Sequence, residues 1–283
     1  ITIASSTGRY GSYLGGTAGA TMDILATRGG SIVITAKREV YTTDDYNFQT
    51  NGGDIVMWPN NTGARKGRLH IGSNNTFNSI GGQTDQATGG GDIIFAGGTD
   101  DGNNRPEGYA RDDTNRHGID LQTGLKVYSG GGEVRLKGRT NKYNDNNTRG
   151  IRQRGDLTMY SGEGAINFDG QILRTNGASG YSIEFADGTS NSVSVISDKA
   201  SGDAITIDGN DTRNTYGVYF HATSSGLFEA TSGGNIMVKT GRGITTSAGY
   251  TFQTKTGNVV FWSDNDADGD GRIYTTNPIV FNS

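Results

Sequence analysis

The chain of 283 residues has no cysteine and only three prolines. It can therefore form no disulfide, and its stability must come from packing and hydrogen bonds. Glycine without proline or a Gly-X-Y period excludes a collagen-like helix. No run of 18 or more apolar residues is present, so no membrane-spanning helix is expected. No signal peptide is recognisable either, and a net charge of −4 is too small to indicate binding to nucleic acid.

Glycine is abundant, with 47 residues, whereas only 32% of the chain is hydrophobic. Clusters of Val, Ile, Leu, Phe and Tyr recur throughout, which distinguishes the chain from a disordered linker. Apolar residues alternate in short segments, as at Ile32/Ile34 and Val134/Leu136, a pattern typical of one face of a strand. No segment has a helical apolar stripe, so the sequence predicts an all-β protein.

A short motif recurs along the chain: glycine, a small or polar residue, an aliphatic residue, any residue, and a second apolar residue. Gly30, Gly132 and Gly234 begin copies that are evenly spaced, with a period of 102 residues. Each of these copies is followed by a second one, at Gly53, Gly155 and Gly257, and the interval between first and second copy is the same in all three cases. The full set begins at Gly30, Gly53, Gly91, Gly132, Gly155, Gly234 and Gly257. These spacings predict one continuous domain over residues 1–283, with three repeat units at about 5–110, 111–209 and 210–283, the last incomplete.

The spacing of the motifs favours a right-handed parallel β-helix, a solenoid in which each coil contributes short strands to a common stack. Intervals of roughly 20–25 residues suit a coil with three short strands and predict about 12 to 14 coils in total. Tandem β-sandwiches of about 100 residues each are the alternative. Both chain ends read as strands, which suggests a segment of a longer polypeptide.

One stretch, GNVVFWSDNDADGDGRI at Gly257–Ile273, together with the glycine-rich strand motifs, resembles the repeats of filamentous-haemagglutinin-like adhesins. These very large bacterial surface proteins have stalks built as right-handed parallel β-helices. The resemblance implies an exported, extracellular, cell-surface fibre with a role in adhesion or biofilm structure. Its partners would be host or environmental surfaces, glycans, or like fibres, with association into homo-oligomers or filaments.

The hypothesis for function is therefore a structural and adhesive segment without catalytic activity. A carbohydrate-active β-helix enzyme, a polysaccharide lyase or hydrolase, is the alternative. Such an enzyme needs paired carboxylates across a groove. The longest loop, Gly97–His117, carries acidic pairs and basic side chains that could serve this chemistry, or could simply decorate the edge of a coil: Asp100, Asp101, Asp112, Asp113, Arg105, Arg111 and Arg116.

An acidic segment near the end of the chain is the candidate metal site. Asp264, Asp266, Asp268 and Gly269 match the first half of an EF-hand loop, but Thr275 stands where that loop has its bidentate glutamate. The segment, which also includes Asp270, can be interpreted as a solvated turn or as a calcium site. No other cofactor is expected. The three histidines, His70, His117 and His221, follow no metal-binding spacing.

Three aromatic residues recur with the same period of 102: Trp58, Tyr160 and Trp262. They could form a stripe of rings on which glycans stack. Packing at a corner of the coil is the other interpretation, because residues four or five coils apart do not form one platform.

Overall fold

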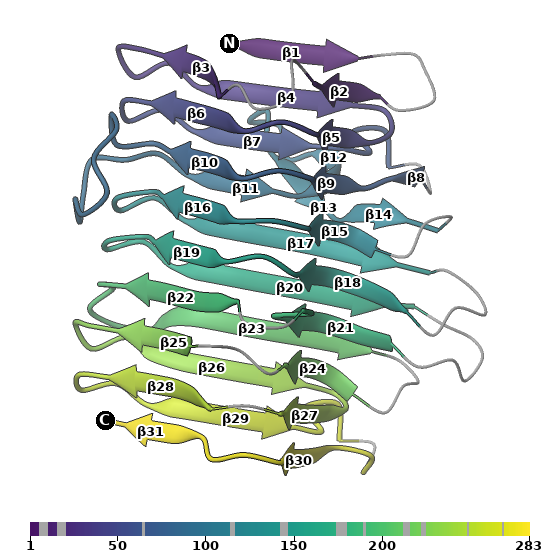
Figure 1. Ribbon diagram of the computed structural model, residues 1–283, viewed down its shortest axis with the longest axis vertical. Coiled ribbons are helices and arrows are strands. Elements are labelled where there is room, and N and C mark those ends of the chain that lie inside the picture. Colours follow the sequence, from purple (N-terminus) through teal and green to yellow (C-terminus); the bar gives the residue numbers. More distant parts are fainter. Residues whose placement is uncertain are drawn as a thin grey trace.

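The structure, a computed structural model, describes residues 1–5, 11–15, 21–63, 66–113, 117–141, 147–173, 180–188, 191–211, 216–221, 225–247, 249–267 and 269–283. The predicted all-β fold is confirmed: in this part of the chain the elements are strands, and no helix could cross a membrane. The chain winds through three parallel sheets in turn and repeats this path coil after coil (Figure 1). The protein is a parallel β-helix, and its two termini lie at opposite ends of the stack.

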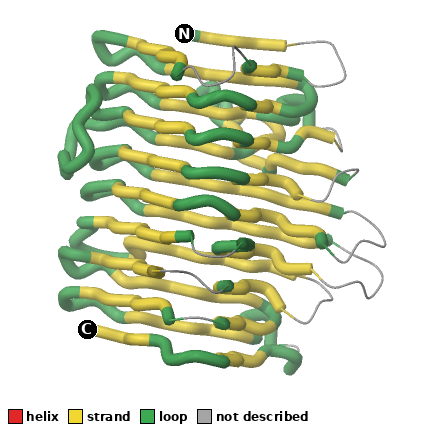
Figure 2. The backbone as a smooth tube through the Cα atoms, viewed as in Figure 1, coloured by secondary structure: helices red, strands yellow, loops and turns green. Residues whose placement is uncertain are grey.

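We call the three sheets A, B and C, in the order in which each coil visits them. Within the described residues, nine coils each contribute one strand to the main path of every sheet. Figure 2 shows these strands stacked in layers, with loops at the corners between sheets. Sheet A contains β1 (Thr2–Ser5), β4 (Ile32–Ala36), β7 (Ile55–Trp58), β11 (Ile93–Phe95), β17 (Val134–Thr140), β20 (Ile166–Ile172), β23 (Asp203–Asp211), β26 (Asn235–Thr240) and β29 (Val259–Ser263). Sheet B contains β2 (Ser12–Leu14), β5 (Val40–Thr42), β9 (Leu69–Ile71), β15 (His117–Leu121), β18 (Thr148–Gln153), β21 (Gly180–Phe185), β24 (Tyr216–Phe220), β27 (Gly243–Thr246) and β30 (Arg272–Thr275). Sheet C contains β3 (Met22–Ala26), β6 (Tyr46–Thr50), β10 (Asn75–Asn78), β16 (Leu125–Tyr128), β19 (Leu157–Tyr160), β22 (Ser192–Ser197), β25 (Ser225–Ala230), β28 (Tyr250–Thr254) and β31 (Val280–Asn282).

The coils are longer and less regular than the motif spacing predicts. Ile32 pairs with Ile55 of the next coil, but Ile93 pairs with the much more distant Val134. The prediction of about 12 to 14 coils is therefore wrong, because the connections between sheets vary in length. The strands that follow Gly30, Gly132 and Gly234 do share sheet A, where β4, β17 and β26 stand three places apart. One period of the repeat thus spans three coils.

The motif at Gly155 precedes a strand of a different sheet. Its strand, β19, belongs to sheet C, whereas the strand after Gly132, β17, belongs to sheet A. The segment between these two glycines is therefore part of one coil and not a full turn. The same local pattern serves both sheets because each strand alternates between the core and the outside.

The recurring glycine of sheet A is required by the close approach of successive coils. A Cβ atom at Gly53 would lie 2.3 Å from the carbonyl oxygen of Gly30, and one at Gly132 would lie 2.2 Å from that of Gly91. The polar residue that follows the glycine makes a second ladder. A side-chain oxygen of Asp54 accepts a hydrogen bond from the Asp92 amide at 2.9 Å, and the next coil repeats this arrangement. Close backbone packing and side-chain hydrogen bonds together therefore hold successive coils against one another at this corner.

A ladder of buried hydroxyls closes the corner where sheet C returns to sheet A. Ser129 Oγ donates to the carbonyl oxygen of Gly132 at 2.6 Å, and Ser161 Oγ donates to that of Gly164 at 2.6 Å. Thr254 makes the same bond to Gly257. These bonds satisfy carbonyl groups that would otherwise be buried without a partner at the bend.

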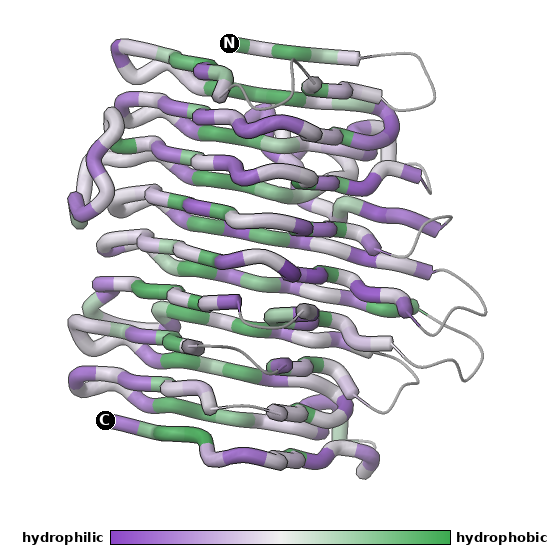
Figure 3. The backbone as a smooth tube through the Cα atoms, viewed as in Figure 1, coloured by the Kyte–Doolittle hydropathy of each residue, from purple (hydrophilic) through white to green (hydrophobic). Residues whose placement is uncertain are grey.

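The core is a narrow column of aliphatic and aromatic side chains enclosed by the three sheets. Phe48 stacks on Phe77 with ring centroids 4.7 Å apart, and Phe228 stacks on Phe252 at 5.0 Å. Figure 3 shows hydrophobic segments recurring along the strands from coil to coil. Since full burial of a large apolar side chain contributes about 1.5–3 kcal/mol, a repeated inward position in each coil accounts for a stable rod despite the low overall hydrophobicity.

Outside this column, the long loop Gly97–His117 adds strands of its own. β12 (Gly97–Asp100) and β13 (Pro106–Gly108) form an antiparallel pair, and β14 (Ala110–Asp112) joins β17 and the short β8 (Lys66–Gly67). A small apolar cluster lies on the outer face of sheet A beside the β12–β13 pair; it comprises Val56, Trp58, Ile94 and Ala96. The pair is fastened to this cluster because Trp58 Nε1 donates to the Gly98 carbonyl oxygen at 2.8 Å.

Candidate functional site

The acidic segment lies in a turn between β29 and β30. Asp264 has a positive φ of 64°, and its carboxylate accepts a hydrogen bond from the Gly269 amide at 3.0 Å. Asp270 forms an ion pair with Arg242 of the preceding coil. Asp268 lies outside the described residues. Within the described part of the chain, the carboxylates of Asp264, Asp266 and Asp270 are not close enough together to be found as a group that could hold a metal ion. The two interpretations of this segment, a solvated turn and a calcium site, both stay open.

The three recurring aromatic residues lie in different environments. Trp58 is on sheet A and is only 7% exposed, so its ring is unavailable to a ligand. Trp262 is also on sheet A, in the last coil, and is 51% exposed. Tyr160 lies on sheet C, where it is half-buried and its hydroxyl bonds to Asp198. The three rings therefore do not form one column, because the repeat period does not return Tyr160 to sheet A.

The described charged residues of the long loop make separate local contacts. Arg105 bridges Asp54 at 2.7 Å and Asp92 at 2.6 Å, which fastens the loop to the ladder at the start of sheet A. Arg111 pairs with Asp113 at 2.8 Å. The side chains of Asp100 and Asp101 accept hydrogen bonds from backbone amides of their own turn; Asp112 is buried, and Arg116 lies outside the described residues.

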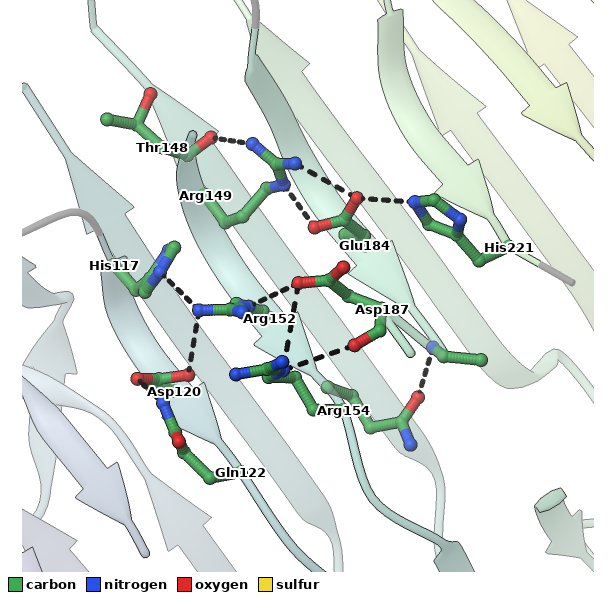
Figure 4. A network of polar contacts seen from close by, with 12 residues as sticks. His117, Asp120, Gln122, Thr148, Arg149, Arg152, Arg154, Glu184, Asp187 and His221 are labelled. Atoms are coloured by element: carbon green, nitrogen blue, oxygen red, sulfur yellow. Dashed lines mark hydrogen bonds and ion pairs between the residues drawn. The ribbon is translucent and has the colours of Figure 1, made fainter. Parts of the chain in front are cut away.

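The most concentrated polar network in the described chain lies elsewhere, on the outer face of sheet B (Figure 4). It is built by a tetrapeptide that recurs in successive coils, with outward side chains at its first and last positions and an inward Ile or Val between them. The second position is glycine in three of the four copies and packs against sheet A: a Cβ at Gly118 would lie 2.3 Å from the amide nitrogen of Arg139. The remaining copy has Ser182 there, whose Oγ donates to the Asn210 carbonyl oxygen at 2.8 Å. The copies are HGID (117–120), RGIR (149–152), YSIE (181–184) and YGVY (216–219).

Parallel register stacks the outward positions of this tetrapeptide into columns. One column places His70, Asp120, Arg152, Glu184 and Tyr219 on neighbouring strands, in this order. A second column places His117 beside Arg149, and Arg149 beside Tyr181 and then Tyr216. In the first column the negative Asp120 and Glu184 flank the positive Arg152, and Arg149 of the second column reaches Glu184 in the next coil.

Glu184 is the centre of one half of the network. Its carboxylate is fully buried and accepts two hydrogen bonds from the Arg149 guanidinium, from Nε and from Nη2, the latter at 3.0 Å. His221 Nε2 lies 2.8 Å from Oε1 of the same carboxylate. The Arg149 guanidinium also lies over the Tyr181 ring at 4.5 Å from its centroid. A bidentate, desolvated pair of this kind has strong geometric specificity.

Arg152 is the centre of the other half. Its Nε donates to Asp187 at 2.6 Å, and its Nη1 donates to His117 Nε2 at 2.8 Å. The same guanidinium lies 3.9 Å from Asp120, whose carboxylate also accepts a hydrogen bond from His70 at 3.2 Å. Because His117 Nε2 accepts a hydrogen bond from Arg152, the neutral imidazole carries its own proton on Nδ1.

Burial and neighbouring charges perturb two of these groups. Burial, helped by the nearby guanidinium of Arg152, lowers the pKa of His117 to about 3 against the opposing effect of Asp120. Burial by itself would raise the pKa of Asp120, but the hydrogen bonds that its carboxylate accepts from His70 and Gln122 hold that pKa below its usual range. At neutral pH the network therefore contains a neutral His117 and an ionised Asp120.

Two carboxylates and an imidazole approach one another closely enough to suggest a metal. The ligand atoms of Glu184, Asp187 and His221 lie within 4.8 Å of one another. Such a donor set suits a transition metal. However, the guanidiniums of Arg149 and Arg152 already bond to both carboxylates, so a cation would have to compete with two fixed positive charges. The residues present fit an ion-pair network better than a metal site.

No pattern in the sequence indicated that the arginines in this network are functional. The recurring tetrapeptide was the available signal, but its copies are separated by connections of different length, and the partners are distant in sequence, as Arg149 and Glu184 are. Comparison of the chain with protein-family models, curated proteins and solved structures finds no match in any of the three.

Proposed function

We propose that this chain is a structural and adhesive segment of an exported bacterial surface fibre, and that it is not an enzyme. In this role the stacked coils provide a stiff rod, and the outer turns and loops contact glycans, surfaces or neighbouring fibres. The resemblance of Gly257–Ile273 to adhesin stalk repeats motivates the proposal. A rod that bears load needs coils that resist separation from their neighbours.

The observation that carries the proposal is the network on sheet B. Its ion pairs and hydrogen bonds run from His70 on β9, through β15, β18 and β21, to His221 after β24, and so join five consecutive coils. Each carboxylate in it already accepts bonds from cationic or polar neighbours. This arrangement resists separation of the coils, whereas a glycosidase would keep a free acid and base facing a groove.

A carbohydrate-active enzyme is the second candidate, and one feature favours it. Glu184, Asp187 and His221 converge beside two arginines, a set of groups that could serve proton transfer and charge neutralisation on an acidic polysaccharide. This chemistry would require the carboxylate of Glu184, now fully buried, to leave its arginine partner.

The test is incubation of the purified protein with neutral and uronic-acid polysaccharides, followed by detection of new reducing ends and unsaturated products. We expect no product with the wild-type chain. Depolymerisation that is lost on Glu184→Gln would overturn the proposal in favour of the enzyme. Activity lost on Asp112→Asn or Arg111→Ala would do the same and would place the active site in the long loop.

The structural role has its own test, stretching of single molecules by atomic force microscopy. We expect a high unfolding force for the wild-type chain and a lower unfolding force for Glu184→Gln.

A further inference from the structure

A polar hollow lies on the outer face of sheet C, on the opposite side of the B–C corner from the charged network. Its volume is about 400 Å³, and it is lined by Asn74, Thr76, Gly124, Lys126, Asp156 and Thr158 among others. This volume lies within the range of small-ligand sites, roughly 300–1,000 Å³.

The hollow exists because one side chain is missing from a column. Asp45, Asn74, Gly124 and Asp156 each directly precede a strand of sheet C, in four successive coils. Asp45 accepts a hydrogen bond from the Asn74 amide, and Asn74 accepts one from the Gly124 amide, each at 3.0 Å. Gly124 cannot continue this ladder, so a gap opens between Asn74 and Asp156.

The outward positions of the strands complete the lining. Thr76, Lys126 and Thr158 are register partners on β10, β16 and β19, and so stand side by side next to the gap. In the described chain the Lys126 ammonium and the two threonine hydroxyls have no protein partner. Asp156 uses Oδ1 to accept from Ser192 and keeps Oδ2 available. Donors and acceptors thus converge on the same small volume.

An aromatic pair lies beside the hollow on the same face. Tyr128 and Tyr160 are register partners, two residues beyond Lys126 and Thr158 on the same strands, which places them roughly 7 Å away along the strand direction. Both rings are half-buried, and the Tyr160 hydroxyl is held by Asp198. A ring fixed in this way presents an apolar face at low entropic cost.

We infer that this face of sheet C binds a neutral oligosaccharide, with one sugar in the hollow and the adjoining part of the chain against Tyr128 and Tyr160. A sugar hydroxyl both donates and accepts, so a pair of adjacent hydroxyls matches a site that offers an ammonium, threonine hydroxyls and a carboxylate oxygen. The single charges of Lys126 and Asp156 cancel, which favours an uncharged ligand. The inference names the ligand class for the adhesive role and therefore rests on the proposed function.

The probes are short neutral oligosaccharides of glucose, mannose, galactose and xylose, with oligogalacturonate as the acidic comparison. Binding is detected by saturation-transfer NMR and measured by calorimetry. Gly124→Asn should weaken binding of a neutral probe at least about tenfold, because a Cβ at this position lies 2.6 Å from Asn74 Oδ1 and the side chain fills the hollow. Lys126→Ala should also weaken it. The matched control, Gly249→Asn, lies in the same column, where a Cβ comes no closer than 3.8 Å to Pro278 O, and should bind as the wild type does.

Absence of saturation transfer to every neutral probe would overturn the inference, as would an unchanged affinity in Gly124→Asn or tighter binding of oligogalacturonate. The same incubations are analysed for cleavage. Cleavage of a bound sugar would overturn the proposed function instead, and the Gly124→Asn comparison would still decide whether the hollow is the binding site. Binding without cleavage, lost in Gly124→Asn and kept in Gly249→Asn, supports both.

Discussion

Replacement of the buried carboxylate at Glu184 should destabilise the protein strongly. In Glu184→Gln the Arg149 guanidinium keeps its buried position, with an 8% exposed side chain, but loses the negative charge that compensates it. Removing one partner of a buried ion pair costs about 3–5 kcal/mol, because the remaining charge is left desolvated. Arg149→Met should cost a similar amount for the opposite reason, since it leaves a buried carboxylate.

The double variant distinguishes pairing from simple loss of packing. Replacing both members by neutral side chains of similar volume removes both desolvated charges, so Arg149→Met/Glu184→Gln should cost much less than the two single changes together. The measurement is urea unfolding followed by circular dichroism, with free energies taken from the midpoint and slope.

Asp208→Asn is the control. Asp208 and Lys239 also pair across adjacent coils, at 3.0 Å, but both side chains are about a third exposed. We therefore expect this variant to lose only about 0–1 kcal/mol of unfolding free energy. A cost below about 1 kcal/mol for Glu184→Gln, or strict additivity in the double variant, would refute the role of this pair in joining coils.

Three further predictions concern pH, backbone contact and calcium. The folded state disfavours protonation of His117, whose pKa is about 3, so stability should fall as pH drops below about 6.5, by up to about 1.4 kcal/mol per unit, and His117→Gln should remove that slope in unfolding curves. Gly132→Ala should cost about 1–3 kcal/mol or more in urea unfolding, because its Cβ would meet the Gly91 carbonyl oxygen at 2.2 Å. Millimolar calcium should leave the midpoint of thermal unfolding unchanged, because Arg242 already compensates Asp270.

Each of these has an outcome that would contradict it. A pH slope that persists in His117→Gln would assign the acid sensitivity to other groups. Gly249→Ala, where the nearest atom is 3.8 Å away, serves as the control for Gly132→Ala, and equal costs would show that the glycine ladder is not limited by backbone contact. A rise in the thermal midpoint with calcium, reversed by a chelator and absent in Asp266→Asn, would establish the calcium site in the acidic turn.

The candidate sites were less predictable than the fold. Recurrence at a fixed period grouped Trp58, Tyr160 and Trp262, yet Tyr160 belongs to another sheet. The pair of Arg149 and Glu184 was not identified, because no local pattern indicates which outward side chain of one coil faces which side chain of the next. The hollow at Gly124 was equally hidden, since it depends on the absence of a side chain between two neighbours that are distant in sequence.

The class of the fold could be predicted from the sequence. Most coils have the same local needs: an inward apolar residue at alternate positions, a glycine where the backbones of successive coils nearly touch, and a polar side chain that bonds to the next amide. Because these needs recur in most coils, they leave a readable motif. The number of coils, the partners of Arg149 and Arg152, and the residues that surround Lys126 could be read only from the folded structure. Connections of variable length separate the strands, so register, and not spacing in the sequence, sets which side chains meet.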